Sequence, residues 1–379
     1  MGMQVLVLGN RQGLNKALEK LDVPYTLLVN QPIKFPPKRA QIIQVKKFPL
    51  RKSELESVAK DLNIKPTHVI ATIESAVLSA SFLRRHLACR LSVHSVIKKC
   101  ALKSEMKSYL RKFEIPMTPF ILSEDFKNNQ ELINQLASEI GYPMVAKEID
   151  NSGGRGIQII QSKKDLERIN NRNLIFEKFI EGSEGSIESF IQDGKILFTN
   201  ITEYFDKKYS NILPANFDKE TTQKILELNE KVIKSLKISW GMTHMEFYQS
   251  KSGLLFGEIA LRPPGGYIMR LLKDAYDFDP WLAFASIELG LAFDFPIKSE
   301  AYAGCLIYHP GEGEVTRIDD VSALSHIQSK FKVVVGQKIK SREGVGEDVG
   351  YSIFSHSNQK QIKNDIQNIK NKSPIKVRN

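Results

Sequence analysis

The sequence has few cysteines and no long apolar run, and both absences narrow what the chain can be. Its three cysteines, Cys89, Cys100 and Cys305, are far apart and show no metal-ligand spacing. We therefore expect free thiols in a reducing cytosol, and hence a cytoplasmic protein. No stretch approaches the roughly 18 apolar residues of a membrane span. The start "MGMQVLVLGN" also lacks the basic and apolar regions of a signal peptide, so no membrane partner is expected.

Two common nucleotide-binding signatures are absent as well. The turn "GNRQG" after the first apolar run lacks the third glycine of GxGxxG, which argues against NAD or FAD. The P-loop pattern GxxxxGK[ST] occurs nowhere in the chain. If this chain binds a nucleotide, it does so with another kind of loop.

Acidic residues are outnumbered, and the formal net charge is +11. The last 50 residues, 330–379, hold eleven Lys and Arg but four Asp and Glu. Such an excess is typical either of a nucleic-acid or membrane-surface patch or of a solvated face with a frayed tail. Because the aromatic residues there are few and not interleaved as stacking platforms, we favour the solvated face and expect no nucleic-acid partner.

What is present is enough apolar material for several cores: 379 residues, 42% of them apolar, indicate two or three domains. Residues 1–98 alternate strand and helix patterns, as in a small doubly wound α/β domain. Residues 99–298 form a mixed central region with a polar loop at 203–220 that is long enough for a lid. Residues 299–379 show short strands between glycine-rich turns, which predicts a small β-rich domain ending in a basic tail.

The strongest chemical clue is the segment "THMEFYQSKSGLLFGEIALRPPGG". It reads as a hairpin turned at "SKSG", which would bring Glu246 and Glu258 onto one face of adjacent strands. Paired carboxylates facing a cavity need a cation, and Mg²⁺ suits oxygen ligands and substrate phosphates. The alternative is two solvent-facing glutamates on an exposed hairpin. Arg262, shortly after Glu258, favours a site that handles a second anion. His244 is either a donor near such a site or a structural hydrogen-bonding residue.

A second clue is "KEIDNSGGRGIQII", where Lys147 precedes the loop Ser152–Gly156. A lysine charge followed by flexible backbone N–H groups can hold phosphates, although a plain hairpin turn has the same composition. The segment "IFEKFIEGSEGS" then gives a strand that ends near Glu177 and continues to Glu184. A backbone edge there can bind an adenine ring, and a carboxylate can accept hydrogen bonds from ribose hydroxyls.

The order of these pieces resembles the ATP-grasp superfamily over residues 1 to about 370. The resemblance implies a Rossmann-like pre-ATP-grasp domain, a two-lobed α+β nucleotide-binding core and a small C-terminal β-rich domain. It also implies ATP and Mg²⁺ as cofactors, with Mn²⁺ as a substitute, and a homodimer.

The resemblance implies a role for each matching residue. The phosphates of ATP would be held by two lysines and a mobile loop: Lys103, Lys147, Ser152, Gly153, Gly154, Arg155 and Gly156. Adenine and ribose would be held by Glu177, Lys178, Phe179, Ile180 and Glu184. Glu246 and Glu258 would bridge the metal, and Arg262 would hold an acylphosphate or a substrate carboxylate. The catalytic set would then be Lys147, Glu258 and Arg262.

One departure refines the expectation. Most of the superfamily has Glu-x-Asn at the second metal position, whereas "GEIALR" places Ala260 there, which puts a standard two-magnesium shell in doubt. The combination with "THMEF" is instead similar to the L-amino-acid ligase branch, which makes dipeptides. We therefore expect an ATP-dependent ligase that joins a small carboxylate to an amine through an acylphosphate. The alternatives are a carboxylase-type enzyme using bicarbonate or a ribonucleotide, and a silent nucleotide- or nucleic-acid-binding protein.

Overall fold

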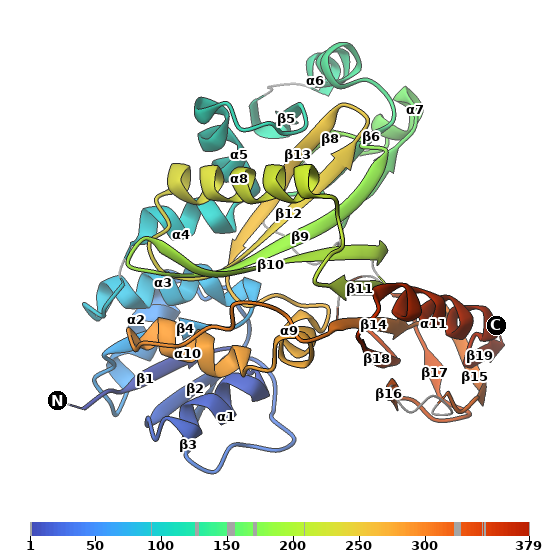
Figure 1. The fold of residues 1–379 in the computed structure, drawn as a ribbon. Coiled ribbons are helices and arrows are strands. Elements are labelled where there is room, and N and C mark those ends of the chain that lie inside the picture. The colour runs from blue at the N-terminus through green and yellow to red at the C-terminus, as the bar shows by residue number, and fades with distance from the viewer. Residues whose placement is uncertain are drawn as a thin grey trace.

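A computed structural model describes residues 2–91, 93–125, 129–149, 156–169, 173–207, 209–321, 327–342, 344 and 346–378. Figure 1 shows four parts: an N-terminal α/β unit at the lower left, a small lobe at the top, a long sheet across the middle, and a C-terminal β-rich unit at the lower right. No helix among these residues is long and apolar enough to cross a membrane.

The N-terminal unit is a four-stranded parallel sheet with the order β3-β2-β1-β4. Its strands are β1 (Val5–Leu8), β2 (Tyr25–Val29), β3 (Ala40–Gln44) and β4 (His68–Ala71). Its helices are α1 (Gln12–Lys20), α2 (Lys52–Asp61), η1 (Glu74–Ala76) and α3 (Val77–His86). Both faces are covered, since Val5 and Val7 pack in one core cluster while Leu6 and Leu8 pack in another. The predicted doubly wound unit is confirmed.

The small lobe contains an antiparallel sheet with the order β5-β8-β6-β7. Two helices lead into it, α4 (His94–Ala101) and α5 (Lys103–Leu110). The remaining elements are η2 (Arg111–Phe113), β5 (Phe120–Leu122), η3 (Ser123–Asp125), α6 (Asn129–Gln135), η4 (Leu136–Ile140), β6 (Met144–Glu148), β7 (Gln158–Ile160), α7 (Lys163–Leu166) and β8 (Leu174–Lys178).

The long sheet has eight strands in the order β13-β12-β9-β10-β11-β14-β18-β16. They are β9 (Gly182–Gln192), β10 (Lys195–Asp206), β11 (Ser210–Leu213), β12 (Gly241–Ser250), β13 (Gly253–Leu261), β14 (Tyr302–Tyr308), β16 (Ile327–Phe331) and β18 (Gly350–His356). Helix α8 (Lys219–Leu236) packs on the face of Ile187 and Met245. Helices α9 (Ile268–Tyr276) and α10 (Pro280–Leu289) pack on the opposite face with the N-terminal unit. The candidate site lies on this second face.

The long sheet contains two tight hairpins, and the one at "SKSG" confirms the prediction from the sequence. β9 and β10 are joined by Asp193 and Gly194, both at positive φ as a tight "DG" turn requires. β12 and β13 are joined across "SKSG" with Ser250 opposite Gly253.

The predicted lid loop at 203–220 is wrong. Its residues instead include the end of β10, strand β11 and the start of α8, which Asp218 caps. The polar residues of this segment lie in strands β10 and β11, which are hydrogen-bonded to each other, and β11 is also bonded to β14. A polar composition therefore did not indicate a loop here.

The C-terminal unit adds a three-stranded sheet, β17-β15-β19, and a helix, α11. Its elements are β15 (Gly313–Ile318), β17 (Lys338–Ile339), α11 (Gln359–Lys372) and β19 (Ile375–Arg378). The basic tail is therefore not frayed, because β19 pairs with β15. The expected boundary at 298–299 falls in a connecting segment, but β14 beyond it pairs with β11 before it.

Candidate active site

The two carboxylates predicted to share a metal lie directly opposite each other. Glu246 on β12 is the cross-strand partner of Glu258 on β13, and Ser186 on β9 is the next residue in the same row. Residues paired in this way project from the same face of the sheet. Each glutamate side chain is 34% exposed, so both are accessible to a ligand yet partly enclosed. The geometry expected from the hairpin is confirmed.

The two predicted phosphate lysines reach the same place, Lys103 from α5 and Lys147 from the small-lobe sheet. Lys103, at the start of α5, has its Nζ 3.5 Å from Glu258 Oε2. Lys147, on β6, lies within electrostatic range of Glu246 and Glu258. Burial alone would lower the pKa of Lys147, but Glu177, Tyr248 and Glu258 raise it above its usual value. Lys147 is therefore cationic next to the carboxylate pair.

Glu177 is buried between two lysines. Its carboxylate lies 3.0 Å from Lys107 Nζ and 3.1 Å from Lys147 Nζ, and only 2% of the residue is exposed. Burial would raise the pKa of Glu177, but the two lysines hold it at about 2. The side chain of Glu177 thus orients Lys147. Because both of its oxygens are paired with lysines, an adenine ring bound here would contact the backbone of this segment and not the Glu177 carboxylate.

That backbone edge contains one open donor. The N–H of Lys178 donates to the Pro119 carbonyl, and the N–H of Phe179 donates to the Pro143 carbonyl. Within the described residues the N–H of Ile180 makes no backbone hydrogen bond. An adenine ring needs such a donor, so the segment fits the predicted role.

Glu184 projects from the same face as Glu246, two positions along β9 from Ser186. Its Oε1 is 2.8 Å from Lys207 Nζ. The predicted ribose ligand is therefore near the site and is now paired with a lysine on the turn after β10.

The predicted glycine loop falls mostly outside the described residues, namely Ser152, Gly153, Gly154 and Arg155. Gly156 is described, exposed and at φ +67°. The flanking strands β6 and β7 are antiparallel neighbours, so the segment connects a hairpin whether or not it also binds phosphate. Both interpretations of this segment therefore remain.

His244 belongs to a buried polar network behind the metal pair. Its Nδ1 is 2.9 Å from Glu188 Oε1, and its Nε2 is 3.6 Å from Glu246 Oε1. Tyr204 on β10 donates to the same Glu246 oxygen at 3.3 Å. Burial would lower the pKa of His244, but Glu188 and Glu246 raise it to about 9. His244 is thus a structural hydrogen-bonding residue that fixes Glu246 from behind.

The cross-strand partner of His244 is Ala260, which occupies the position where most of the ATP-grasp superfamily has an asparagine metal ligand. The small methyl group leaves room on this face for the imidazole.

Arg262 lies just beyond the end of β13 and turns towards the N-terminal unit. Its Nε pairs with Glu74 Oε2, and its Nη1 donates to the Pro263 carbonyl at 2.9 Å. The arginine is therefore positioned at the junction of the N-terminal unit and the long sheet.

The donor set fits a hard divalent cation. Directly opposed carboxylates repel one another, and a cation with oxygen ligands removes the repulsion. Burial would raise the pKa of Glu246, but His244 and Lys147 lower it, so the group is ionised. The described residues contain no group of three or more His, Cys, Asp or Glu that could hold a metal ion alone.

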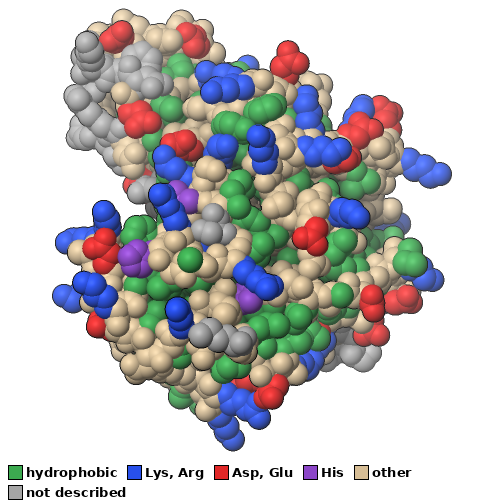
Figure 2. Space-filling view, turned by 90° about the vertical axis from the view of Figure 1, so that its left-hand side faces the viewer, with side chains coloured by type: hydrophobic (Ala, Val, Ile, Leu, Met, Phe, Trp, Pro, Cys, Tyr) green, Lys and Arg blue, Asp and Glu red, His purple; other side chains and the backbone are tan. Residues whose placement is uncertain are grey.

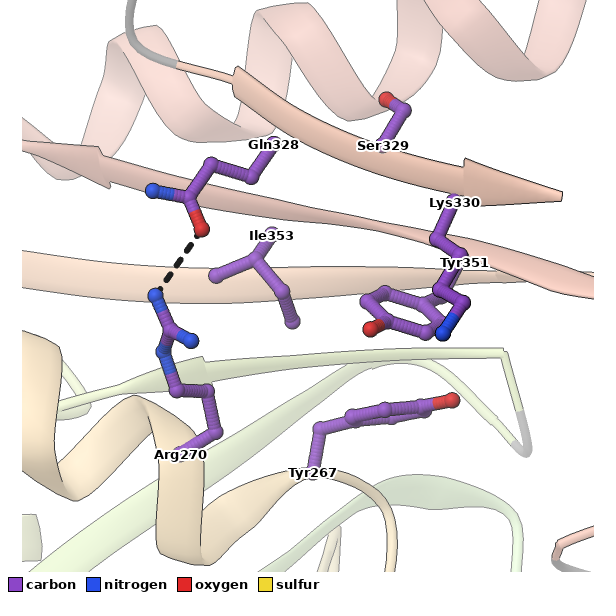
Figure 3. A pocket seen from close by; sticks show the side chains of 7 residues that line it. All are labelled: Tyr267, Arg270, Gln328, Ser329, Lys330, Tyr351 and Ile353. Carbon is purple, nitrogen blue, oxygen red and sulfur yellow. Dashed lines mark hydrogen bonds between the residues drawn. The ribbon is translucent and has the colours of Figure 1, made fainter.

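A separate pocket of about 450 Å³ lies between α9 and strands β16 and β18 (Figure 3). Its lining residues are Tyr267, Arg270, Gln328, Ser329, Lys330, Tyr351 and Ile353. Arg270 Nη2 donates to Gln328 Oε1 at 2.9 Å across its mouth. None of the predicted site residues lines it, so the pocket is not the candidate active site.

Comparison with known proteins agrees with this arrangement. Residues 108–266 match the family model of the ATP-grasp domain. The sequence is 27% identical over 242 residues to the L-arginine-specific L-amino acid ligase of Bacillus subtilis, covering 59% of this chain and 57% of that protein. The chain thus spans little more than half the length of this curated relative.

Solved structures share the fold over nearly the whole chain. The L-amino acid ligase from Bacillus licheniformis has a TM-score of 0.82 at 17% identity, covering 100% of this chain and 99% of the other. The N5-carboxyaminoimidazole ribonucleotide synthetase from Thermotoga maritima has a TM-score of 0.76 at 18% identity, covering 99% of each chain.

The chain therefore carries an ATP-grasp domain and has the ATP-grasp fold. Within that class, it resembles the L-amino-acid ligases, as the sequence pattern predicted.

Proposed function

We propose that this chain is an ATP-dependent carboxylate–amine ligase that forms an amide or peptide bond and releases ADP and phosphate. The observation that carries the proposal is the pair Glu246–Glu258, opposed on adjacent strands, with Lys103 and Lys147 beside it. This is the arrangement needed to hold a metal–triphosphate in line with an attacking group. The similarity to an L-amino acid ligase supports an amino acid or similar small carboxylate as substrate.

The chemistry proceeds in two steps. A carboxylate oxygen of the first substrate attacks the γ-phosphorus of ATP, the bond to the β-phosphate oxygen breaks, and ADP leaves. The amine of the second substrate then attacks the acyl carbon, phosphate leaves and the nitrogen loses a proton.

In this scheme the phosphates are held by Lys103, Lys147 and the loop Ser152–Gly156. The adenosine is held by the backbone of 178–180 and by Glu184, which must exchange Lys207 for the ribose hydroxyls. Arg262 stabilises the acylphosphate charge.

Glu246 and Glu258 would hold Mg²⁺, or Mn²⁺ in its place, and the bound ion supplies charge neutralisation at the phosphates. The residues around them do the positioning: Tyr204 and His244 fix Glu246, while Lys103 fixes Glu258.

A carboxylase-type reaction with bicarbonate or a ribonucleotide is the second candidate, because the fold is shared with a ribonucleotide synthetase. A silent nucleic-acid-binding protein has less support, since much of the C-terminal basic charge is used in ion pairs. These pairs are Lys332–Asp348, Lys363–Glu203, Lys370–Asp206 and Arg378–Glu314.

The deciding experiment is phosphate release from ATP and Mg²⁺ across a matrix of amino acids, other carboxylates, amines and bicarbonate. Release that needs both a carboxylate and an amine, with the amide product seen by mass spectrometry, supports the ligase. Release that needs bicarbonate, with no amide, would replace it by the carboxylase. The cytoplasmic location and the homodimer stay predictions.

A further inference from the structure

The N-terminal unit changes direction between two neighbouring strands of its sheet, β1 and β4. The chain runs from β1 to β2 and β3 on one side, and β4 then lies on the other side of β1. The connections that leave the carboxyl ends of β1 and β4 therefore diverge. In open parallel sheets, such a topological switch point is where ligands bind.

The two connections are in close contact at their base. Gly9, directly after β1, has φ +87°, and a Cβ there would lie 2.7 Å from Thr72 Oγ1. The N–H of Thr72 donates to the Leu8 carbonyl at 3.0 Å. Residues a few positions further along each connection consequently lie near the same end of the sheet.

Those side chains are charged. Arg11 follows on the first connection and immediately precedes α1, whose first turn contains no acidic residue. Glu74 begins η1 on the second connection. Arg262 comes from the end of β13 and pairs with Glu74, which joins the second connection to the strand that carries Glu258.

The charges do not balance. Glu74 is engaged by Arg262, and none of the described residues gives the side chain of Arg11 a hydrogen bond or an ion pair. Burial and the nearby charge of Arg262 both lower the pKa of Arg11, although a guanidinium stays ionised. A partly buried cation beside a second cation is stabilised when an anion completes the set.

We propose that Arg11 binds a carboxylate of the amine-donating substrate, so that this substrate is an amino acid with a free carboxylate. The inference rests on the proposed ligase function. The carboxylate that ATP activates must lie at the lysines and the glutamate pair, and the reaction consumes it. A carboxylate held by Arg11 lies on the other side of Arg262, remains ionised throughout and becomes the free end of the product.

The test compares amino acids with their amides as amine donors, for example alanine with alaninamide and arginine with argininamide. Each pair has the same side chain. The amide has the less basic amino group, so a larger fraction of it is unprotonated and able to attack at pH 8, and a preference for the acid cannot come from protonation of the amine. KM and kcat are measured by phosphate release with ATP and the activated carboxylate held constant.

For the unchanged protein we expect a KM for the amino acid roughly 10- to 100-fold below that for its amide, as for one charge-assisted contact. Arg11→Gln should raise the KM of the amino acid to that of the amide and leave the KM of ATP unchanged. Arg11→Lys, which keeps the charge but loses the forked geometry, should fall between them.

Arg51→Gln is the matched control. Arg51 is also an arginine at a helix N-cap after a strand of the same sheet, but it is exposed and precedes α2, which packs against α3. The Arg51→Gln protein should keep the same ratio between the KM for the amino acid and the KM for its amide as the unchanged protein.

This design distinguishes failure of the Arg11 assignment from failure of the proposed ligase function. If the protein ligates but accepts amides as readily as acids, or if Arg11→Gln retains the preference, the assignment of Arg11 is overturned and the ligase stands. If no carboxylate–amine pair releases phosphate, it is the proposed function that fails.

Discussion

Glu258 is the residue on which the catalytic proposal depends most directly, because it lies opposite Glu246 on the neighbouring strand and forms an ion pair with Lys103. Glu258→Gln keeps the shape but removes the charge that would hold the metal. We expect turnover to fall by roughly 10²-fold or more, on the scale of losing one preorganised electrostatic contact. Steady-state phosphate release at saturating ATP measures this. Glu230→Gln, on the exposed side of α8, is the control, and full activity in Glu258→Gln would refute the metal assignment.

Glu177 gives a prediction about pH. Its pKa is held at about 2 by Lys107 and Lys147, below the ordinary value of 4.5. A carboxyl with a depressed pKa stabilises the fold above the unfolded pKa, and this contribution is lost as pH falls through the folded pKa. At pH 7 we expect Glu177→Gln to reduce the free energy of unfolding by about 3 kcal/mol or more, because two buried lysines lose their partner.

Urea unfolding of both proteins from pH 7 to pH 2 tests this. The difference between them should shrink between about pH 4.5 and pH 2, because the carboxylate takes up a proton there in the unfolded chain while the folded protein keeps it ionised. A difference that stays constant across this window would show that the ion pairs do not contribute.

Sequence reasoning placed Glu246 and Glu258 on one hairpin, and the structure sets them opposite each other. The "SKSG" turn alone would put Gly257 opposite Glu246, and a β-bulge between Glu246 and Phe247 shifts the register so that Glu258 takes that place. The hairpin was predictable from the sequence, whereas the bulge was not. Partners far apart in the chain were not predictable either: Glu74 is 188 residues from Arg262, and Glu188 is 56 residues from His244. Lys107 lies one helical turn after Lys103, which is visible in the sequence, but its burial against Glu177 depends on how the small lobe folds.

At the scale of elements, the segment between β6 and β7 still has two interpretations. If Ser152–Gly156 closes over the γ-phosphate, Gly153→Ala with Gly154→Ala should restrict its backbone and raise the KM for ATP by about tenfold. The KM for the amine donor should not change and serves as the internal control. An unchanged KM for ATP would leave a plain hairpin connection.

Elements with a strong local pattern followed the sequence closely, as the β9–β10 hairpin with its "DG" turn shows. The failure at 203–220 has a physical reason: β11 is a short strand with polar residues, and it exists because β10 and β14 supply its hydrogen bonds from either side. Tertiary pairing of this kind leaves no periodic signal in four residues.

At the scale of the whole molecule, the long sheet crosses the expected boundary at residue 298. A chain ending there would expose the edge of β11 and remove most of the core cluster that contains Leu306 and Phe354. We expect such a truncated chain to aggregate and to lose its cooperative unfolding transition. Size-exclusion chromatography and urea denaturation measure this, and a monomeric, cooperatively unfolding product would show that residues 1–298 are self-sufficient.

On the face shown in Figure 2, basic and acidic side chains are interspersed, and the outline is indented on the left between the small lobe and the rest of the molecule. One continuous core joins the N-terminal unit, the long sheet and the first strands of the C-terminal unit, through residues such as Leu14, Phe190 and Cys305. The small-lobe sheet instead has its own clusters, around Ile121 and Phe120.

This division of the cores separates the small-lobe sheet from the rest of the molecule. Met106 and Leu110 of α5 pack in the core cluster of the long sheet, so Lys103 and Glu258 lie on the same side of the division. An ion pair that crosses it joins Lys107 of α5 to Glu177 of β8, and any movement of the small-lobe sheet against the body would have to break this buried pair.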